Sequence, residues 1–179
     1  MIILGVDPGT IKCGYGIIEK DKSGKYSLID SGVINLGSIS TIPDKLEIIC
    51  SRLKDLIKKH RPDEFAIETA FYGKNVQSAL KIGLARGAAI VAAKQQKLNV
   101  SEYSPREIKK AVTGNGAASK EQVAYMAKTI LTLKNTELKL DETDALGVAL
   151  CHSFRFKHEG AKSKSWKSFI ANNPERILQ

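Results

Sequence analysis

Cysteine is scarce in this chain, and long hydrophobic runs are missing from it. The three cysteines among 179 residues, Cys13, Cys50 and Cys151, lie far apart and form no CxxC pair. Such scattered thiols offer neither a disulfide framework nor a cysteine metal site, and they fit a reducing compartment. No apolar run approaches the roughly 18 residues of a membrane span, and the first residues lack the basic stretch of an export signal. We therefore expect a cytoplasmic protein without a membrane partner.

Two common active-site motifs are also missing. The sequence contains no GxxxxGK[ST] phosphate loop and no HExxH zinc motif. The segment Asp7-Pro8-Gly9-Thr10 resembles the first phosphate loop of the actin-like ATPases, which leaves a nucleotide-binding fragment as one hypothesis. Those proteins normally contain two such domains, whereas the length of this chain leaves room for one. Chain length therefore argues against the ATPase hypothesis.

Acidic residues are outnumbered by basic ones. Lysine and arginine total 28 against 19 aspartates and glutamates, for a net charge of +9. A positive field of this size favours a polyanionic partner, and nucleic acid is the first candidate. A solvated basic surface without a specific partner explains the charge equally well. With 42% hydrophobic and 26% charged residues, the composition is that of a globular domain.

Hydrophobic periodicity predicts a mixed α/β domain. An antiparallel meander of strands is expected over residues 2–7, 14–20 and 26–36, followed by an amphipathic helix over residues 44–60. A strand over residues 64–68 and an Ala-rich helix over residues 76–96 form a βα unit, and residues 100–103 add a fifth strand. Further helices begin at Pro105, at a capping box of Ser119 with Gln122, and near Asp141. The sequence therefore predicts a five-stranded mixed sheet flanked by helices over residues 1–156, and a basic, partly flexible tail over residues 157–179.

Four acidic residues stand at the ends of these elements. Asp7 and Glu68 close the first and fourth strands, where α/β sheets present groups to ligands, although either one alone is better explained as a solvent-facing or turn residue. Asp141 and Asp144 are three residues apart at the start of the last helix, so their side chains share one face. Ordinary helix capping explains that pair better when it is considered alone.

The combination of four carboxylates with a basic protein indicates metal-dependent chemistry. Oxygen ligands favour Mg²⁺, with Mn²⁺ as the alternative, over zinc. Two such ions would activate a water and stabilise the leaving oxygen of a phosphodiester, while the basic surface holds the nucleic acid backbone. The four acids are therefore a candidate catalytic and metal-binding set.

Three segments resemble the bacterial RuvC resolvases. They read ILGVDPGTIKCGYGII, FAIETAFYGKNVQSALKIGLARGAAIVAA and DETDALGVAL, and together they extend the resemblance over about residues 1–153. The resemblance implies the ribonuclease H-like fold, a homodimer, and symmetric nicking of two strands at a four-way (Holliday) DNA junction that leaves 5′-phosphate ends. It also implies that Asp7, Glu68, Asp141 and Asp144 bind the metal. The branch-migration proteins RuvA and RuvB are further candidate partners.

The resemblance also indicates which residues contact DNA. Phe71 matches an aromatic position suited to stacking on unpaired bases, and Lys109 and Lys120 match basic positions close to the scissile phosphate. Without the resemblance, Phe71 is as well explained by packing on the domain and the lysines by a solvated helix face. Further candidates for backbone contact are Lys74, Lys81 and Arg86.

Two other functions stay open at this stage. A ribonuclease H-like enzyme acting on RNA or hybrids has the same composition, and a non-catalytic junction-binding protein would use the acids only as caps and surface residues. Small residues of the long helix, including Gly83 and Gly87, allow close approach of another backbone, either the sheet or a second subunit. A C₂ dimer would place one active site on each of two equivalent strands.

Overall fold

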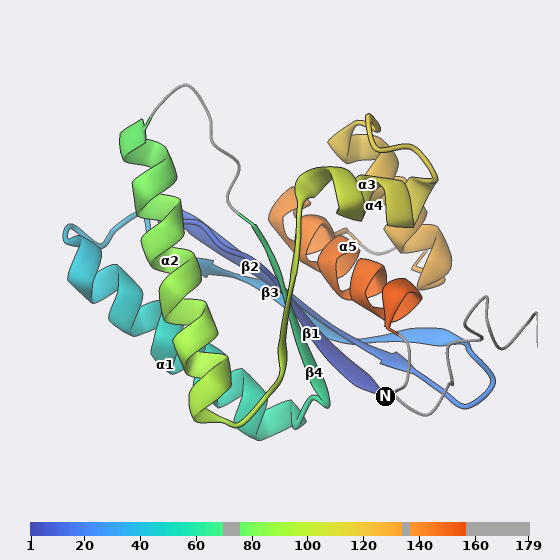
Figure 1. Cartoon of the computed structure of the whole chain (residues 1–179), viewed down its shortest axis with the longest axis horizontal. Coiled ribbons are helices and arrows are strands. Elements are labelled where there is room, and N and C mark those ends of the chain that lie inside the picture. The colour runs from blue at the N-terminus through green and yellow to red at the C-terminus, as the bar shows by residue number, and fades with distance from the viewer. Residues whose placement is uncertain (70–75, 134–136, 157–179) are drawn as a thin grey trace, which may run out of the picture.

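A five-stranded mixed sheet separates two layers of helices (Figure 1). The computed structural model describes residues 1–69, 76–133 and 137–156. The strand order is β3-β2-β1-β4-β5; β1 pairs antiparallel with β2 and parallel with β4. The elements are β1 (Ile2–Asp7), β2 (Lys12–Lys20), β3 (Tyr26–Asn35), α1 (Ile42–His60), β4 (Glu64–Glu68), α2 (Val76–Gln95), β5 (Val100–Tyr103), α3 (Pro105–Thr113), α4 (Lys120–Ile130) and α5 (Leu140–Arg155).

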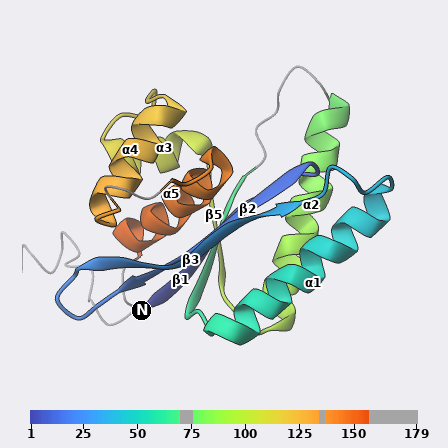
Figure 2. The same ribbon diagram turned by 180° about the vertical axis from the view of Figure 1, so that it is seen from behind.

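Helices α1 and α2 cover one face of the sheet, and α3, α4 and α5 cover the other, as the front and back views show (Figures 1 and 2). Each face has its own core. Leu4 and Val6 of β1 belong to the core beneath α1 and α2, whereas Ile3 belongs to the core beneath α5. Because successive side chains of a strand point to opposite faces, Gly5 and Asp7 lie on the α5 face with Ile3.

Glycines let α5 lie directly on the central strands. A Cβ atom added to Gly14 of β2 would overlap the carbonyl oxygen of Asp141, and one added to Gly5 of β1 would overlap the carbonyl oxygen of Ala145. Ala145 and Ala149 are themselves small and fully buried. The start of α5 is therefore held against the ends of β1 and β2 by backbone contact, close to Asp7.

The expected fold is confirmed, with shifts at several element ends. The mixed sheet, the meander and the helices are all present, and Ser119 and Gln122 form the expected reciprocal capping box. Strand β2 begins at Lys12, two residues earlier than expected. The candidate DNA residues Phe71 and Lys74, and the expected tail over residues 157–179, lie outside the described residues.

Candidate active site

The structure brings the four predicted acids together at one end of the sheet. Asp7 and Glu68 end the neighbouring parallel strands β1 and β4, and their carboxyl groups are hydrogen-bonded to each other. Asp141 and Asp144 approach from the first two turns of α5, near enough for the charge of each to act on Asp7. Strand alternation places Asp7 on the face of the sheet that α5 covers, and the backbone contact between α5 and the strands brings the helical acids to it.

Burial and mutual repulsion favour the protonated form of the strand-end acids. Burial raises the pKa of Asp7, and the charge of Asp144 raises it further. The pKa of Glu68 is raised to about 8, first by burial and then by the charge of Asp7. A proton shared between these two side chains would relieve the repulsion, because two adjacent carboxylates resist ionising together. Added positive charge would therefore stabilise this part of the site.

Two lysines supply positive charge to the helical acids Asp141 and Asp144 through ion pairs. Lys120 at the start of α4 places its Nζ 2.6 Å from Oδ2 of Asp144. Lys12 at the start of β2 places its Nζ 3.4 Å from Oδ2 of Asp141. The carboxylate of Asp144 raises the pKa of Lys120, which therefore stays charged at neutral pH. Each helical acid thus has its own ammonium partner, one from each side of α5.

The capping explanation for the helical acids is wrong. The residue at the N-cap of α5 is Lys139, which makes no side-chain capping hydrogen bond. Asp141 and Asp144 follow it inside the helix, and their carboxylates turn toward lysines of other elements. Favourable interaction with the helix dipole is retained by Asp141, but it does not explain the direction of either side chain.

A cavity of about 230 Å³ opens beside the acids. Its polar wall contains Glu68 and Asp144 together with the predicted basic residues Lys109 and Lys120. Its apolar wall is made by Pro105, Ile108 and Val123 of α3 and α4. Two carboxylates and two ammonium groups that line one small cavity are suited to holding a phosphate next to a cation.

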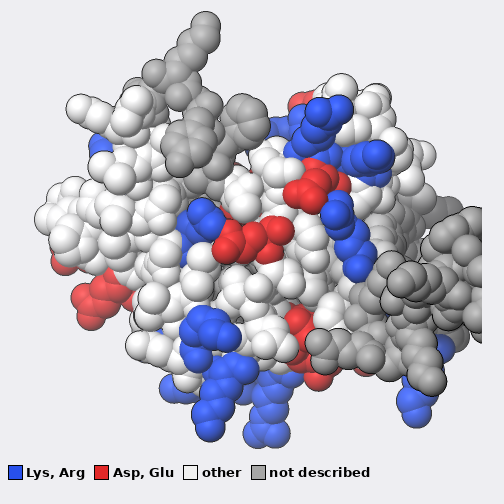
Figure 3. All heavy atoms as spheres, in the orientation of Figure 1, with Lys and Arg blue, Asp and Glu red and all other residues white. Residues whose placement is uncertain are grey.

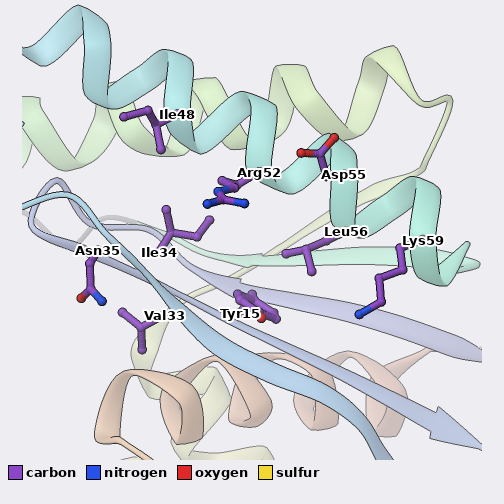
Figure 4. Close-up of a pocket in the computed structure, with 9 residues that line it drawn as sticks. All are labelled: Tyr15, Val33, Ile34, Asn35, Ile48, Arg52, Asp55, Leu56 and Lys59. Atoms are coloured by element: carbon purple, nitrogen blue, oxygen red, sulfur yellow. The ribbon is translucent and has the colours of Figure 1, made fainter.

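A larger cavity, of about 610 Å³, lies on the other face of the sheet, between α1 and strands β2 and β3 (Figure 4). The close-up shows Arg52, Asp55 and Lys59 on α1 above Tyr15 and Asn35 of the strands. Asp55 is the single acid in its lining, so this cavity offers no set of carboxylates for metal-dependent hydrolysis. The acid cluster is therefore the better candidate for the active site, although its cavity is smaller.

Among the described residues, no group of three or more histidine, cysteine, aspartate or glutamate side chains is already arranged to hold a metal ion. The donor set nevertheless suits a hard cation, because it consists of carboxylate oxygens alone. The raised pKa of Asp7 and Glu68 and the two lysine pairs show that positive charge is favoured at each of the four acids. The residues present therefore fit a divalent metal.

The remaining DNA candidates on α2 lie apart from this cluster. Lys81 is exposed, and Arg86 forms an ion pair with Glu102 of β5. That pair uses Nη2 of Arg86 and partly neutralises the charge that Arg86 could offer to a phosphate.

Lys12 is the site residue that the sequence-based reasoning missed. With the strand started at residue 14, Lys12 fell in a turn. In the structure it is part of β2 and follows the alternation of Gly14 and Gly16, which face α5. Extending the strand pattern by one more alternation would have placed Lys12 on the same face as the acids.

Two solved structures of one protein are similar to this chain. The chain is similar to a Thermus thermophilus RuvC structure, with a TM-score of 0.79 and 33% identity over 86% of this chain and 94% of that chain. It is also similar to T. thermophilus RuvC in complex with Holliday junction substrate, with a TM-score of 0.77, 30% identity and the same coverage. The fold is thus that of a protein solved together with a branched DNA.

Sequence comparison leads to the same family. A family model described as "Crossover junction endodeoxyribonuclease RuvC" matches residues 3–152. The RuvC protein of Chloroherpeton thalassium is 44% identical over 187 residues, covering all of both chains. The chain therefore belongs to the RuvC family of crossover junction endodeoxyribonucleases.

Proposed function

We propose that this protein resolves four-way DNA junctions by metal-dependent, symmetric nicking of two strands, leaving 5′-phosphate ends that a ligase can seal. The observation that carries the proposal is the meeting of Asp7, Glu68, Asp141 and Asp144 beside a cavity that also contains Lys109 and Lys120. Membership of the RuvC family supports both the chemistry and the substrate. This function also accounts for the excess of basic residues.

The four acids would hold divalent metal, for which we propose two Mg²⁺ ions, with Mn²⁺ as a substitute. When bound, such ions supply the positive charge that activates water and stabilises the leaving oxygen in phosphodiester hydrolysis. Asp7 and Glu68 would then give up the proton that they share, because cationic neighbours lower carboxyl pKa values. Asp141 and Asp144 would exchange their ammonium partners for the stronger charge of the metal.

The lysines of the cavity would act on the phosphate. Lys120 stays charged and lines the cavity together with Asp144, so it can transfer its hydrogen bond to a phosphate oxygen. Lys109 of α3 lines the same cavity. Two ammonium groups placed where negative charge increases during hydrolysis would stabilise the transition state.

Basic residues beyond the cavity are suited to holding a DNA arm. Arg106, Lys110 and Arg155 line a neighbouring groove between α3 and the end of α5. Basic side chains also gather over the α3 and α4 end of the face in Figure 3. Because phosphate contacts position a duplex without reading its sequence, this surface would support recognition of junction shape.

The decisive experiment replaces Asp7 by Asn, which keeps the size of the side chain and removes its charge. We expect the variant to bind a synthetic four-way junction as well as the wild type does, and to lose at least about 100-fold in cleavage rate with Mg²⁺, the size of effect expected when a main source of transition-state stabilisation is removed. The matched control is Asp63→Asn, at an acid that binds the amide of Ile2 at the opposite end of the sheet. Undiminished cleavage by the Asp7 variant would contradict the mechanism.

Substrate choice needs a separate comparison. Wild-type protein is incubated with a four-way junction, a linear DNA duplex and an RNA/DNA hybrid under the same metal concentrations. We expect preferential cleavage of the junction. Preference for the hybrid would favour the ribonuclease H-like alternative, and binding without any cleavage would favour a non-catalytic junction-binding protein.

We also propose a homodimer that is formed through α2. Four apolar side chains of this helix are exposed: Val76, Leu80, Leu84 and Val91. A Cβ atom added to Gly83 or Gly87 would meet nothing within 4 Å, so these small residues face open space, whereas Ala85 and Ala89 pack into the core. By length and composition α2 could also span a membrane, the one such helix in the part of the chain that the structure describes. Its ion pair from Arg86 to Glu102 and its packing on α1 fit a protein contact better.

Three further expectations belong to the same proposal. The protein would act in the cytoplasm of a bacterium, with RuvA and RuvB as partners in branch migration. Residues 1–156 would form the nuclease domain, and residues 157–179 would form a basic extension. Phe71 and Lys74 would contact the junction from the segment between β4 and α2.

A further inference from the structure

Lys12 and Lys120 approach the acid cluster from opposite sides. Lys120 comes from the start of α4 and pairs with Asp144, whereas Lys12 comes from the start of β2 and pairs with Asp141. The side chain of Lys12 is 53% exposed and that of Asp141 is 31% exposed, so this pair is in contact with solvent. It can therefore open without rearrangement of the core.

The backbone gives Lys12 a defined position. Its residue pairs with Asn35 in the ladder between β2 and β3. The chain reverses tightly before it, so that a Cβ atom added to Gly9 would overlap the carbonyl oxygen of Lys12. Gly14, two residues further along the same face, allows the backbone of Asp141 to contact the strand. The start of β2 and the start of α5 are thus held together, and Lys12 is directed at Asp141.

We propose that Lys12 is a resident counter-ion for Asp141, which a divalent metal must displace before the site is complete. This inference rests on the proposed metal-dependent function and adds to it a residue that tunes metal affinity. In the metal-free protein the ammonium group of Lys12 forms an ion pair with the carboxylate of Asp141, and it repels an incoming cation. Lys12 therefore raises the metal concentration at which the active site fills, and it stabilises the acid cluster until then.

The expected size of the effect is modest because the pair is exposed. Surface ion pairs contribute up to about 1 kcal/mol, and repulsion between an ammonium and a divalent ion a few ångströms away in a watery site is of the same order. Loss of the ammonium should therefore tighten metal binding by about three- to tenfold.

The test measures metal binding and not cleavage. Mn²⁺ is titrated calorimetrically into the wild-type protein and into Lys12→Gln, which removes the charge and retains most of the length. Lys12→Arg keeps the charge at the same place, and Lys22→Gln removes one charge from the exposed turn at the far end of β2. We expect the Mn²⁺ dissociation constant to fall about three- to tenfold in Lys12→Gln alone.

A double-mutant cycle with Asp141→Asn assigns the effect to this pair. Lys12→Gln should change Mn²⁺ affinity much less in the Asp141→Asn background, because the carboxylate for which metal and ammonium compete is gone. Unchanged or weaker Mn²⁺ binding by Lys12→Gln in the otherwise wild-type protein overturns the inference and leaves the nuclease proposal intact. Failure of wild-type protein to bind Mn²⁺ at all overturns both.

Thermal unfolding gives a second readout. In EDTA, Lys12→Gln should melt at a lower temperature than Lys22→Gln, because Asp141 loses its partner. Saturating Mn²⁺ should remove that difference by supplying the missing charge. A difference that persists in saturating Mn²⁺ would show that Lys12 acts only on the fold, and it would contradict the role as a displaceable counter-ion.

Discussion

At the scale of single residues, the site combines groups that repel one another. Burial raises the pKa of both Asp7 and Glu68; the charge of Asp7 raises the pKa of Glu68 further, and the charge of Asp144 does the same for Asp7. Such an arrangement is unfavourable for folding at neutral pH unless a proton or a metal supplies positive charge. The Asp7 and Glu68 pair lowers the stability of the metal-free protein at neutral pH, so its presence is explained by function and not by stability.

The Asp7 and Glu68 pair predicts an unusual pH dependence of stability. The pKa of Glu68 is raised from 4.5 to about 8 in the folded protein, so the folded state retains the proton over a range where the unfolded state has released it. Stability of the metal-free protein should consequently fall as pH increases from about 5 to 8. Melting temperatures in EDTA across this range provide the measurement.

Replacement of Glu68 by Gln should remove most of that pH dependence and raise the melting temperature in EDTA at pH 8. Glu47→Gln, on the exposed side of α1, serves as the control and should follow the wild type. Saturating Mg²⁺ should flatten the wild-type profile. A wild-type melting temperature that rises steadily from pH 5 to 8 in EDTA would contradict the assignment.

The identity of the acids could be predicted from sequence, whereas their ion pairs could not. Periodicity placed Asp7 and Glu68 at strand ends and Asp141 and Asp144 at a helix start, but only their combination and the resemblance to RuvC resolvases made them a set. The pairing of Lys12 with Asp141 and of Lys120 with Asp144 depends on how α4 and β2 are placed around α5. Strand alternation can give the face on which Lys12 lies, but it cannot give these pairs, because they result from packing between elements distant in sequence.

At the scale of elements, helix α5 completes the candidate active site that begins at the strand ends. It contacts β1, β2 and β4, and its first two turns bring Asp141 and Asp144 to the strand ends. The existence of this helix followed from the apolar pattern after residue 141. The short distance between α5 and the strands could not be predicted in this way. It depends on glycines whose role becomes clear only when the backbones of α5 and the strands are seen in contact.

Gly14→Ala tests the importance of this close approach. The added methyl group would overlap the carbonyl oxygen of Asp141, so α5 must move away from β2. We expect a loss of about 1–3 kcal/mol in the free energy of unfolding, as for other overpacked contacts. Junction cleavage should fall more than junction binding does, because Asp141 moves with the helix.

Gly37→Ala is the matched control for that substitution. Its added methyl group would meet Cγ2 of Ile11 at 3.9 Å, an ordinary van der Waals distance. Chemical denaturation and cleavage assays on both variants make the comparison. Full stability and full activity in Gly14→Ala would show that α5 is not held at this depth.

At the scale of the whole molecule, the two faces of the sheet serve different purposes. The acids, the small cavity and the basic groove all lie on the side of α3, α4 and α5. Helix α2, which contains the exposed apolar residues Val76, Leu80, Leu84 and Val91, covers the opposite face of the sheet (Figure 2). A dimer formed there would leave both active sites accessible to DNA.

Charge placed on α2 should separate the proposed dimer. Leu80→Glu combined with Leu84→Glu introduces two acids one helical turn apart, at side chains that are 66% and 43% exposed. We expect a monomer in light scattering coupled to gel filtration, with an unchanged fold because neither residue is in the core. Coordinated nicking of the two strands of one junction should be lost.

Ile29→Glu is the control, since Ile29 is 38% exposed on β3, far along the sheet from α2. That variant should behave like the wild type in the same experiment. A dimer that survives both charges on α2 would mean that the subunits meet elsewhere.

The irregular pairing of β2 with β3 affects where the sheet can accept a change in strand length. The register of the two strands shifts between Ile17 and Ile18, so that Ile29 is an extra residue of the outer strand, while the pairing of β1 with β2 is continuous from Ile2 to Asp7. A slip of one residue in β1 would turn Asp7 to the wrong side of the sheet. We therefore expect insertions and deletions in β3 to be tolerated better than those in β1, because a bulge in the outer strand absorbs a change of length without turning Asp7 to the other face.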